Sequence, residues 1–405
     1  MTSKPPKIVV TGMGALCSLG TSAAGIWDAM KAGTCGIGPI TTVDLSENKV
    51  AAGAEIKQLP DIGLDHRRLV TMDRMAHLAV LAADQAWKQS GLPTSETGHK
   101  RIGAIVGVGT FGGISIDEAY RAVWRDMKRF PPIFTVPKAM PGAAAGQVSM
   151  HLGLKGPVFG VSSACASSNH AIGQAVDMLR SGRADAMLAG GADAPLIFGV
   201  LRAWEALRVL SPEPCSPFSA GRSGLSIGEG AGMFVLERED HALARGAAIL
   251  AELAGFGMTG DASDIVAPGV EGPAEAMIQC LADAGLLPAD IDYINAHGTA
   301  TKANDVIETA AIRIAFGPAA DRLSVSSTKS MHAHCMGASG SIELIACIGA
   351  IRDGIVPPTV NYTTADPECD LDVTPNVAKS REVRAALSNS FAFGGTNAVL
   401  CVRKY

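Results

Sequence analysis

The feature that most constrains the fold is a series of short apolar runs that end near glycine or serine and alternate with helical patterns. The runs are KIVVTG, RIGAIVGVG, GPVFGVSSA and ADAMLAGG, then ILAELAGFG, IDYINAHG, LSVSS and RAALSNSF. Runs of this kind are typical of strands buried on both faces. Between them, apolar residues such as Met75, Leu78 and Ala82 recur at helical spacing. The alternation predicts an α/β fold with mostly parallel sheets covered by helices.

The chain also carries signs of two related halves. Its 405 residues exceed one ordinary hydrophobic core, so length alone favours two units. The charged stretch EREDHALARGAAI, residues 237–249, ends the first series of strands and predicts halves 1–250 and 251–405. Val-Ser-Ser closes a predicted strand in each half, at residues 161–163 and 325–327. This weak self-similarity supports a duplication.

Composition argues against several classes of protein. The net charge of −5 disfavours a general nucleic-acid binder, because neutralising phosphates requires an excess of Lys and Arg. Charges such as Asp185, Asp193 and Arg202 interrupt the apolar stretches, so none reaches the ~20 residues of a membrane span. Nine cysteines without a CxxC pair fit a reducing compartment and indicate no zinc site. With no secretory signal pattern, we expect a cytoplasmic protein.

Cys165 lies where a strand meets a helix in GPVFGVSSACASSNHAIGQAVDMLRSG. A thiol at this turn meets backbone N–H groups and the positive end of the helix dipole, both of which favour the thiolate. A lone cysteine in an apolar protein is more often inert core. Position alone therefore leaves a nucleophile and a buried structural thiol both open.

Three further segments carry groups that suit a reaction site. His297 follows an apolar strand in INAHGTATKAND, although a structural histidine is the alternative. In SVSSTKSMHAHCMGASGSIELIACIGAI, Lys329 and Glu343 would be costly to bury unpaired, so we expect them to pair or to touch a charged group. The glycines of NSFAFGGTN permit a backbone N–H to aim into a pocket, although an ordinary hairpin turn reads similarly.

In this order, the motifs VSSACASS, NAHGTAT, SSTKSMHAH and NSFAFGGTN closely resemble the elongating, Cys-His-His type of β-ketoacyl-acyl-carrier-protein synthase. The resemblance covers essentially the whole chain. It implies the thiolase-like fold, in which duplicated α/β halves stack in five layers, αβαβα, and a homodimer. It also implies decarboxylative Claisen condensation of substrates carried on the phosphopantetheine of acyl carrier protein, with no metal or redox cofactor.

The resemblance assigns catalytic roles residue by residue. Cys165 is similar to the nucleophile that accepts the acyl chain, and His297 and His334 are similar to the paired catalytic histidines. Lys329 resembles the lysine that accompanies the second histidine. Phe393 resembles the aromatic gate, whose backbone N–H joins that of Cys165 in the oxyanion hole.

Other residues are expected around the substrates. Thr299 and Thr301 resemble the threonines that hydrogen-bond the pantetheine arm, and Glu343 resembles a buried acid that is structural or pairs with Lys329. We expect the acyl tunnel to be lined by Thr110, Phe111, Ile114, Phe134 and Phe198. Because carrier proteins are acidic, a cationic landing site is expected. Its candidates are Arg67, Arg68, Arg125, Lys128, Arg129 and Arg208.

Two details depart from the common fatty-acid synthases of this group. His332 and Ala333 stand where Thr-Gly is usual, so His332 is an additional histidine without an assigned role. Ala392 replaces a glycine often found before the gate phenylalanine, which would stiffen the gate. With WEALRVLSP around Trp204, these details are most similar to nodulation-type ketosynthases of plant-symbiotic bacteria. The resemblance thus adds a specialised lipid or nodulation signal to housekeeping lipids as the alternative destinations of the product.

Three other functions are alternatives to decarboxylative condensation. Residues 107–112 match GxGxxG after a strand and indicate a nicotinamide or flavin oxidoreductase, but no strand ending in a ribose-binding acid follows. A degradative thiolase would carry a second catalytic cysteine near the C-terminus, where this chain has FAFGGTN. A noncatalytic partner that sets chain length usually lacks the nucleophile, and Cys165 is present.

Overall fold

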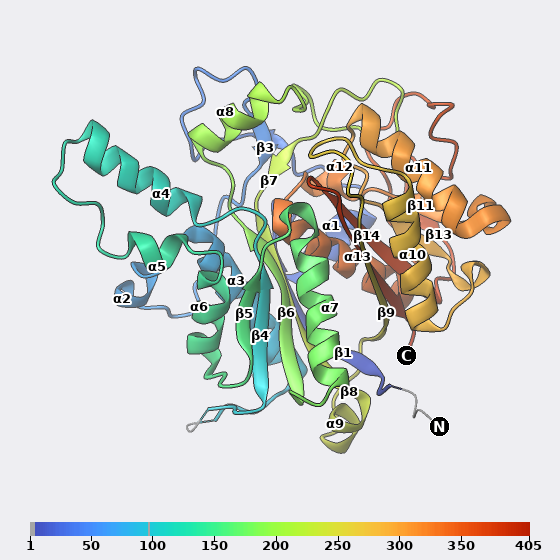
Figure 1. Ribbon diagram of the computed structural model, residues 1–405, viewed down its shortest axis with the longest axis horizontal. Helices are drawn as coiled ribbons and strands as arrows, with labels where there is room; N and C mark the ends of the chain where they lie inside the picture. The colour runs from blue at the N-terminus through green and yellow to red at the C-terminus, as the bar shows by residue number, and fades with distance from the viewer. Residues whose placement is uncertain (1–4, 96–97) are drawn as a thin grey trace.

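The computed structural model describes residues 5–95 and 98–405 and shows two halves built on one plan (Figure 1). The strands of the first half are β1 (Ile8–Leu16), β4 (Ile102–Gly107), β5 (Val158–Val161), β6 (Ala186–Asp193) and β8 (Gly230–Arg238). Those of the second half are β9 (Ala251–Gly260), β10 (Tyr293–Asn295), β11 (Ser324–Ser326), β14 (Ala385–Ala392) and β15 (Thr396–Arg403).

The strand order shows the duplication directly. The first half orders its strands β1-β8-β6-β4-β5, and the second orders them β9-β15-β14-β10-β11. In each half the first two pairings are antiparallel and the last two are parallel. Short pairing between β1 and β9 joins the halves into one ten-stranded sheet within residues 5–95 and 98–405. The duplication predicted from the Val-Ser-Ser repeats is therefore confirmed.

Helices cover the strands in layers (Figure 1). The outer helices are α3 (Arg74–Ser90) and α6 (Ala143–Leu152) on the first half, and α10 (Glu271–Ala284) and α11 (Lys302–Phe316) on the second. The central helices, α7 (Ser167–Arg180) and α13 (Ser339–Asp353), pack against each other and against strands of both halves. The arrangement is the predicted αβαβα stack of five layers.

The central helices bring the two Val-Ser-Ser segments to one place. β5 ends before α7, and β11 ends before α13, so the segment with Cys165 and the segment with His334 both lie at the carboxyl ends of parallel strands. Residues 339–351 of α13 are all buried, as expected for a core helix. Gly349 is needed there, because a Cβ at this position would lie 2.4 Å from the ring of Trp27.

The remaining elements are shorter. The helices are α1 (Ala23–Lys31), α2 (His66–Leu69), α4 (Gly113–Tyr120), α5 (Thr135–Ala139), α8 (Phe198–Ala206), α9 (Glu239–Ala244) and α12 (Lys329–His332). The short strands are β2 (Gly38–Pro39), β3 (Ala52–Ala54), β7 (Ile227–Gly228), β12 (Ile355–Val356) and β13 (Lys379–Ser380). α9 connects β8 to β9 within the charged stretch, and we propose that the halves divide near residue 250.

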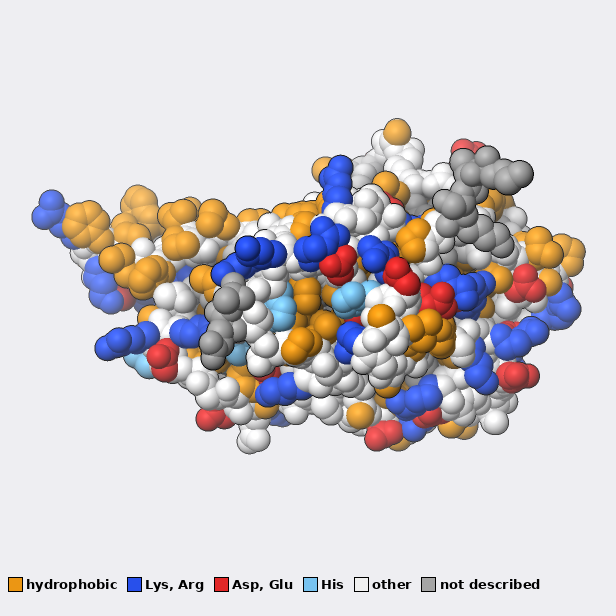
Figure 2. Space-filling model, turned by 90° about the horizontal axis from the view of Figure 1, so that it is seen from below, with side chains coloured by type: hydrophobic (Ala, Val, Ile, Leu, Met, Phe, Trp, Pro, Cys, Tyr) orange, Lys and Arg blue, Asp and Glu red, His pale blue; other side chains and the backbone are white. Residues whose placement is uncertain are grey.

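An arm formed by residues 113–140 projects from the body and carries α4, a π-helical turn and α5 (Figure 1). Figure 2 shows hydrophobic and basic side chains gathered on this projection, at the left of the view. Its most exposed apolar residues are Trp124, Met127, Phe130, Ile133 and Val136. Across the described part of the chain, no helix is both long and apolar enough to cross a membrane.

Candidate active site

Cys165 lies at a sharp turn between β5 and α7. Ala164 before it has a φ of 47°, a conformation that is strained for a residue other than glycine and is common at functional sites. Ser167 fixes the turn, because its Oγ accepts from the Ser163 N–H (2.9 Å) and donates to the Ala164 carbonyl (2.7 Å). The thiol is buried and stands at the N-terminal end of the central helix.

His334 lies against this thiol. Its Nε2 is 3.0 Å from Cys165 Sγ. On the other side of the ring, the Met336 backbone N–H donates to Nδ1 over 3.0 Å, and Ser339 Oγ is 2.9 Å from the same nitrogen. A ring nitrogen that accepts from an N–H carries no proton, so the neutral ring is protonated on Nε2. His334 therefore directs an N–H into the site.

His297 is positioned by the buried carboxylate of Glu308. The backbone N–H groups of His297 and Gly298 donate to Glu308 over 2.8 and 2.7 Å. Asn389 donates to the same carboxylate over 3.1 Å. Sequence patterns place Glu308 only within a helix and do not reveal this contact. Glu308, from α11, thus fixes the loop that presents His297 after β10.

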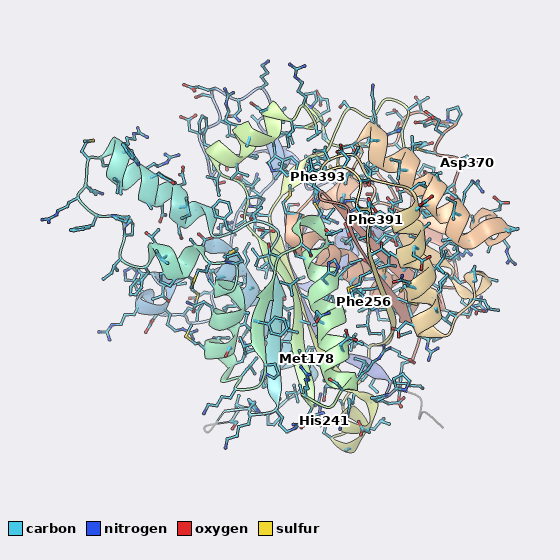
Figure 3. All side chains as sticks on the ribbon, viewed as in Figure 1. Met178, His241, Phe256, Asp370, Phe391 and Phe393 are labelled. Carbon is cyan, nitrogen blue, oxygen red and sulfur yellow. The ribbon has the colours of Figure 1, made fainter. Side chains whose placement is uncertain are left out.

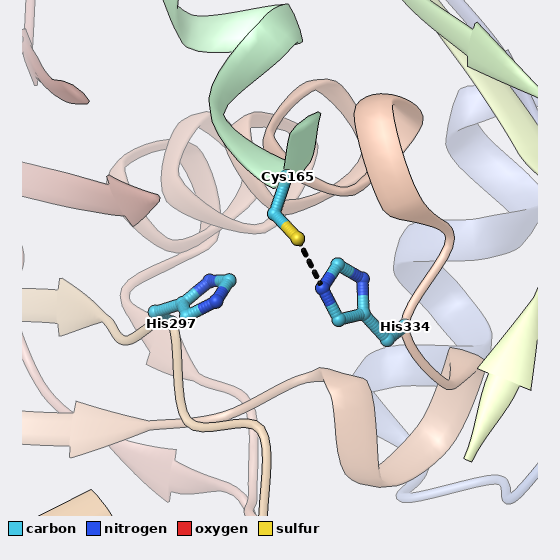
Figure 4. Close-up of side chains that lie close together, drawn as sticks. All are labelled: Cys165, His297 and His334. Atoms are coloured by element: carbon cyan, nitrogen blue, oxygen red, sulfur yellow. Dashed lines mark hydrogen bonds between the residues drawn. The ribbon is translucent and has the colours of Figure 1, made fainter. Parts of the chain in front are cut away.

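Cys165, His297 and His334 meet in one site (Figure 4). The two imidazole rings lie edge to face with their centroids 5.5 Å apart. The Cys165 sulfur and one ring nitrogen from each histidine all lie within 4.8 Å of one another. Three such groups could ligate Zn²⁺. However, His334 aims an N–H at the sulfur, not a lone pair. The geometry instead suits a carbonyl group that lies beside the thiol and accepts hydrogen bonds from the histidines.

Burial controls protonation in the site. Burial lowers the pKa of His297 and of His334 well below the usual value, and the charge of Lys329 lowers both pKa values further. Both imidazoles are therefore neutral at physiological pH. Burial raises the pKa of Cys165 to about 12, although Lys329 and hydrogen bonds from the backbone N–H groups of Cys165 and Phe393 lower it.

The protonation of Cys165 differs from the expectation based on its place in the sequence. The helix end and the backbone N–H groups are present and favour the thiolate, but burial has the larger effect and favours the thiol. The backbone N–H groups of Cys165 and Phe393 both lie near enough to the sulfur to lower the pKa of the thiol. Such a pair of donors is suited to an oxyanion that forms during attack on a thioester.

Lys329 and Glu343 form a buried pair beside the histidines. Lys329 Nζ donates a hydrogen bond to Glu343 Oε1, and both side chains are buried. Burial raises the pKa of Glu343 to about 7, although the charge and the hydrogen bond of Lys329 lower it. Pairing offsets the cost of burying each charge. The structure thus pairs the two residues as predicted and holds a cation near His297 and His334.

The additional histidine, His332, does not line the reaction pocket. Its Nε2 is 3.1 Å from Thr328 Oγ1, and its Nδ1 is 4.0 Å from Cys335 Sγ. Burial lowers the pKa of His332 to about 3, with a further lowering by Lys329. His332 is a neutral, hydrogen-bonded residue of the core.

A pocket that opens to solvent reaches Cys165. Besides Cys165, His297 and His334, its lining includes Trp204, Val209, Leu225, Asp264, Val266, Ala267, Pro268, Thr299, Thr301, Phe391 and Phe393. The hydroxyl oxygens of Thr299 and Thr301 lie 2.9 Å apart, and Thr301 also caps α11. The walls are otherwise mostly apolar. The pocket therefore offers an extended, largely apolar substituent a route to the thiol with one polar pair along it.

Phe111 and Arg208 lie outside this pocket. Phe111 is 40% exposed and does not line the cavity at Cys165, because the chain turns at Gly112 into α4 and leads away from the thiol. Arg208 is exposed beside the lining residue Val209. Of the other residues expected in an acyl tunnel, Phe134 is 39% exposed on the arm, and Ile114 and Phe198 line a separate pocket.

Asp193, at the end of β6, has a structural role that its sequence context does not reveal. The buried carboxylate accepts hydrogen bonds from the N–H groups of Gly109 (2.8 Å) and Gly337 (2.7 Å) and from the Thr110 hydroxyl. It thereby ties the end of β4 to the loop after His334. Burial raises the pKa of Asp193 to about 6. In the sequence, the residue shows only as an acid at the end of an apolar strand.

Asp193 is expected to make stability depend on pH. Its folded pKa of about 6 exceeds its ordinary value of 3.8, so the native state binds this proton more tightly than the unfolded state. The resulting stabilisation is complete below about pH 4 and is lost as pH rises through about 6, with an upper limit of ~3 kcal/mol. Asp193→Asn, which cannot titrate, should lose this part of the dependence. Urea unfolding of both proteins from pH 4 to 7 would test this, and parallel stability curves would contradict it.

The glycine-rich run at residues 107–112 serves close packing. A Cβ on Gly107 would lie 2.4 Å from the Ser167 backbone, and one on Gly109 would lie 2.7 Å from the Ala164 carbonyl oxygen. A Cβ on Gly112 would meet the backbone of Lys138 at 2.4 Å. Gly107 and Gly109 let β4 and the chain after it approach the turn that holds Cys165, and Gly112 lets the chain pass close to α5, which is not the role of a dinucleotide-binding loop.

Comparison with known proteins agrees with this geometry. Residues 6–242 match the family model "Beta-ketoacyl synthase, N-terminal domain", and residues 250–363 match "Beta-ketoacyl synthase, C-terminal domain". The "Nodulation protein E" of Rhizobium sp. (strain N33) is 59% identical over 398 residues, which cover 98% of this chain and 99% of that protein. The nodulation-type resemblance is thereby confirmed.

Two further proteins connect the chain to ketosynthases. The "3-oxoacyl-(acyl-carrier-protein) synthase 2" of Staphylococcus aureus (strain COL) is 41% identical over 412 aligned residues, covering 100% of this chain and 99% of that protein. The solved structure of a type II PKS acyl-carrier protein in complex with its ketosynthase bound to the hexaketide matches with a TM-score of 0.89 at 30% identity, covering 99% and 100% of the two chains. The chain therefore belongs to the β-ketoacyl synthase family.

Proposed function

We propose that the protein extends an acyl chain by two carbons, joining acyl and malonyl groups that are carried on acyl carrier protein. The observation that carries this proposal is the convergence of the Cys165 thiol, an N–H of His334 at 3.0 Å and two backbone N–H donors in one pocket. A nucleophile, a donor for a carbonyl and an oxyanion hole are the groups that this chemistry requires.

In the first step, Cys165 takes the acyl group from its carrier. The sulfur attacks the thioester carbonyl, and the backbone N–H groups of Cys165 and Phe393 stabilise the oxyanion. Loss of one such donor typically costs ~3 kcal/mol of barrier. The carrier's pantetheine thiol leaves with the proton that the Cys165 thiol gives up. The buried site keeps water away from the new thioester.

In the second step, a malonyl thioester is decarboxylated and joined to the acyl group. Neutral His297 and His334 donate hydrogen bonds to its carbonyl, so the enolate left by loss of CO₂ is stabilised. The enolate carbon attacks the acyl thioester of Cys165, forms the new C–C bond and expels the sulfur, which regains a proton from solvent. The sequence involves no change in redox state, so we propose that it needs neither a metal nor a redox cofactor.

The carrier's pantetheine arm is assigned to the pocket that opens at Thr299 and Thr301. Hydroxyl groups there can bond the amides of the arm while the apolar walls contact its methylene and dimethyl groups. Acyl carrier protein itself would dock around this opening. Arg208, exposed beside the lining residue Val209, is our first candidate for a carrier contact. Arg67, Arg125, Lys128 and Arg129 are further exposed candidates.

We further propose that the product serves a specialised lipid, as in a nodulation signal. The support is the 59% identity to a Nodulation protein E, against 41% to the synthase 2 of Staphylococcus aureus. A cytoplasmic location is part of this proposal, because the carrier-bound substrates are made there. Comparing acyl donors of different length and unsaturation would show whether the protein prefers acyl groups other than those of common membrane lipids.

We also propose that two copies of the chain form a homodimer. β5 is an edge strand of the sheet and exposes Phe159, and the arm exposes a set of large apolar side chains that a soluble monomer would rarely leave in water. Light scattering after size exclusion should give twice the 41.6 kDa of the chain. Phe130→Glu combined with Ile133→Glu should shift this mass toward that of one chain. A wild type of one chain's mass at micromolar concentration would refute the dimer.

The condensation can be tested by reconstitution with acyl-carrier and ¹³C-labelled malonyl-carrier thioesters. We expect a β-ketoacyl product two carbons longer than the donor, with one CO₂ released for each product molecule. Cys165→Ala is the matched control, because it retains the pocket and both histidines. Absence of product with every donor, from a protein that is folded and binds the carrier, would favour a noncatalytic partner instead.

A further inference from the structure

Phe393 is placed at the tip of the hairpin between β14 and β15. Ala392 and Thr396 form the last pair of the hairpin, so Phe393 is the first residue beyond the ladder. Gly394 and Gly395 follow it with φ values of 81° and 67°, a region that glycine adopts without strain. Figure 3 shows Phe393 near the upper end of α7, above Phe391. The tip is therefore a place where the backbone can change course at low cost.

The ring of Phe393 is stacked on that of Trp204. The two centroids are 5.7 Å apart and the planes differ by 29°, and both residues line the pocket that contains Cys165. The two residues are far apart in the chain and belong to different halves. Among the described residues, this is the ring contact that the structure gives Phe393.

Trp204 is itself held firmly. It belongs to α8 and packs against an apolar cluster that includes Leu201, Leu225 and Met336. The neighbours of Trp204 on α8 are tied to the loop at residues 47–50, because Arg202 donates to the Glu47 carbonyl (3.0 Å) and Glu205 accepts from the Val50 N–H (2.9 Å). A movable hairpin tip thus rests against a fixed aromatic ring.

The position of the Phe393 ring bears on the chemistry because the backbone N–H of the same residue lies near enough to the Cys165 sulfur to lower the pKa of the thiol. A shift of the tip that separates the rings would also move this donor. Aromatic stacking favours the stacked position of the tip over a displaced one by about two- to tenfold, in addition to the effect of burying the rings. The stack therefore affects the acylation of Cys165 if the Phe393 N–H must be in place before the acyl thioester binds.

We propose that Trp204 is a positioning residue: by stacking on Phe393 it holds the hairpin tip so that the Phe393 N–H faces Cys165 and the ring narrows the approach to the thiol. The role assigned to the N–H rests on the proposed function, whereas the narrowing of the approach does not. The competing explanation is that Trp204 only fills the apolar cluster and meets Phe393 incidentally.

Two rates separate these explanations. The first is alkylation of Cys165 by iodoacetamide, followed on the Cys165 peptide by mass spectrometry, which requires no acyl chemistry. Trp204→Leu should speed it by about two- to tenfold, because the tip no longer narrows the approach. The second is acylation by an acyl carrier thioester, which Trp204→Leu should slow by a similar factor with little change in KM. Trp204→Phe retains a stacking ring and should remain within about twofold of wild type in both rates.

A double-variant comparison excludes a general loosening of the fold. Phe393→Ala removes the same contact from the other side, so Trp204→Leu should add less than about twofold in that background. Leu243→Ala is the control, because Leu243 is 57% exposed on α9, outside the arm, and does not line the pocket.

The proposal would be overturned if Trp204→Leu changed the two rates by the same factors in wild type and in the Phe393→Ala background. It would also be overturned if Trp204→Leu left the alkylation rate unchanged. If Trp204→Leu did not fold, Phe393→Ala alone should still speed alkylation, and an unchanged rate would also overturn it. If wild type were alkylated but never acylated, the proposed function would fail while the alkylation series still judged the role of Trp204.

Discussion

Cys165→Ala is expected to lose the acyl adduct and to condense acyl and malonyl groups at least about a thousandfold more slowly than wild type. The reason is that the proposed reaction passes through a thioester on this sulfur, and alanine offers no other nucleophile. Alanine should fit the site, because it removes one buried atom and leaves the turn at Ala164 and Ser167 intact. Intact-mass spectrometry with acyl-carrier donors and a radiolabelled condensation assay measure the two losses.

Cys35→Ala is the matched control for this prediction. Cys35 is an exposed free cysteine outside the pocket, so its loss should change neither the adduct nor the rate. If Cys165→Ala formed as much acyl adduct as wild type, the nucleophile would have to be another residue. Nearly normal condensation by that variant would argue against a covalent intermediate.

His297→Ala and His334→Ala are each expected to slow malonyl decarboxylation by about a hundred- to a thousandfold. Each variant removes a neutral N–H donor that would stabilise the enolate as CO₂ leaves. Acylation of Cys165 should survive in at least one of them, because that step relies on backbone donors. Release of ¹⁴CO₂ from labelled malonyl-carrier thioester measures the first effect, and the acyl adduct measures the second.

His332→Gln provides the matched control for the histidine variants. His332 is buried two residues before His334, but it bonds Thr328 and does not line the pocket. The His332→Gln variant should decarboxylate malonyl-carrier thioester at nearly the wild-type rate, provided that its melting temperature shows that it is folded. Rapid decarboxylation by both His297→Ala and His334→Ala would refute the role assigned to the pair.

Much of the fold could be predicted because buried strands leave a clear pattern. The eight apolar runs correspond to β1, β4, β5, β6, β9, β10, β11 and β14. The eight runs do not include β8, which begins with Gly-Ala-Gly but pairs with both β1 and β6 in the centre of the sheet, or β15, which begins with Thr-Asn. The strand order and the joining of the halves through β1 and β9 depend on contacts between distant segments, which local patterns do not contain.

Cys165, His297 and His334 could be predicted as candidate catalytic residues because the ordered motifs that contain them resemble those of a known enzyme family. Cys165 and His297 also lie at strand ends, where a reactive group is expected, whereas only the resemblance singles out His334 within its segment, and the structure brings all three together. The roles of Asp193 and Glu308 could not be predicted, because they depend on the backbone N–H groups that donate hydrogen bonds to these buried carboxylates. Their partners lie in other segments of the chain.

The protonation of Cys165 could not be predicted from the helix end alone. The end of a helix and nearby N–H groups lower the pKa of a thiol, whereas burial raises it, and only the folded structure gives the extent of burial. The neutral state of His334 likewise depends on burial and on Lys329. Its tautomer depends on the Met336 N–H, which no sequence motif specifies.

A single-turnover chase of the acyl-enzyme tests the central claim most directly. The wild-type enzyme is first acylated on Cys165, and the excess acyl donor is removed. Malonyl-carrier thioester is then added, and the intact masses of the enzyme and of the carrier protein are followed over time by mass spectrometry. We predict that the acyl mass leaves the enzyme at the same rate as a β-ketoacyl group two carbons longer appears on the carrier. Persistence of the adduct while product forms, or its loss as free acid without product, would contradict the proposed relay through Cys165.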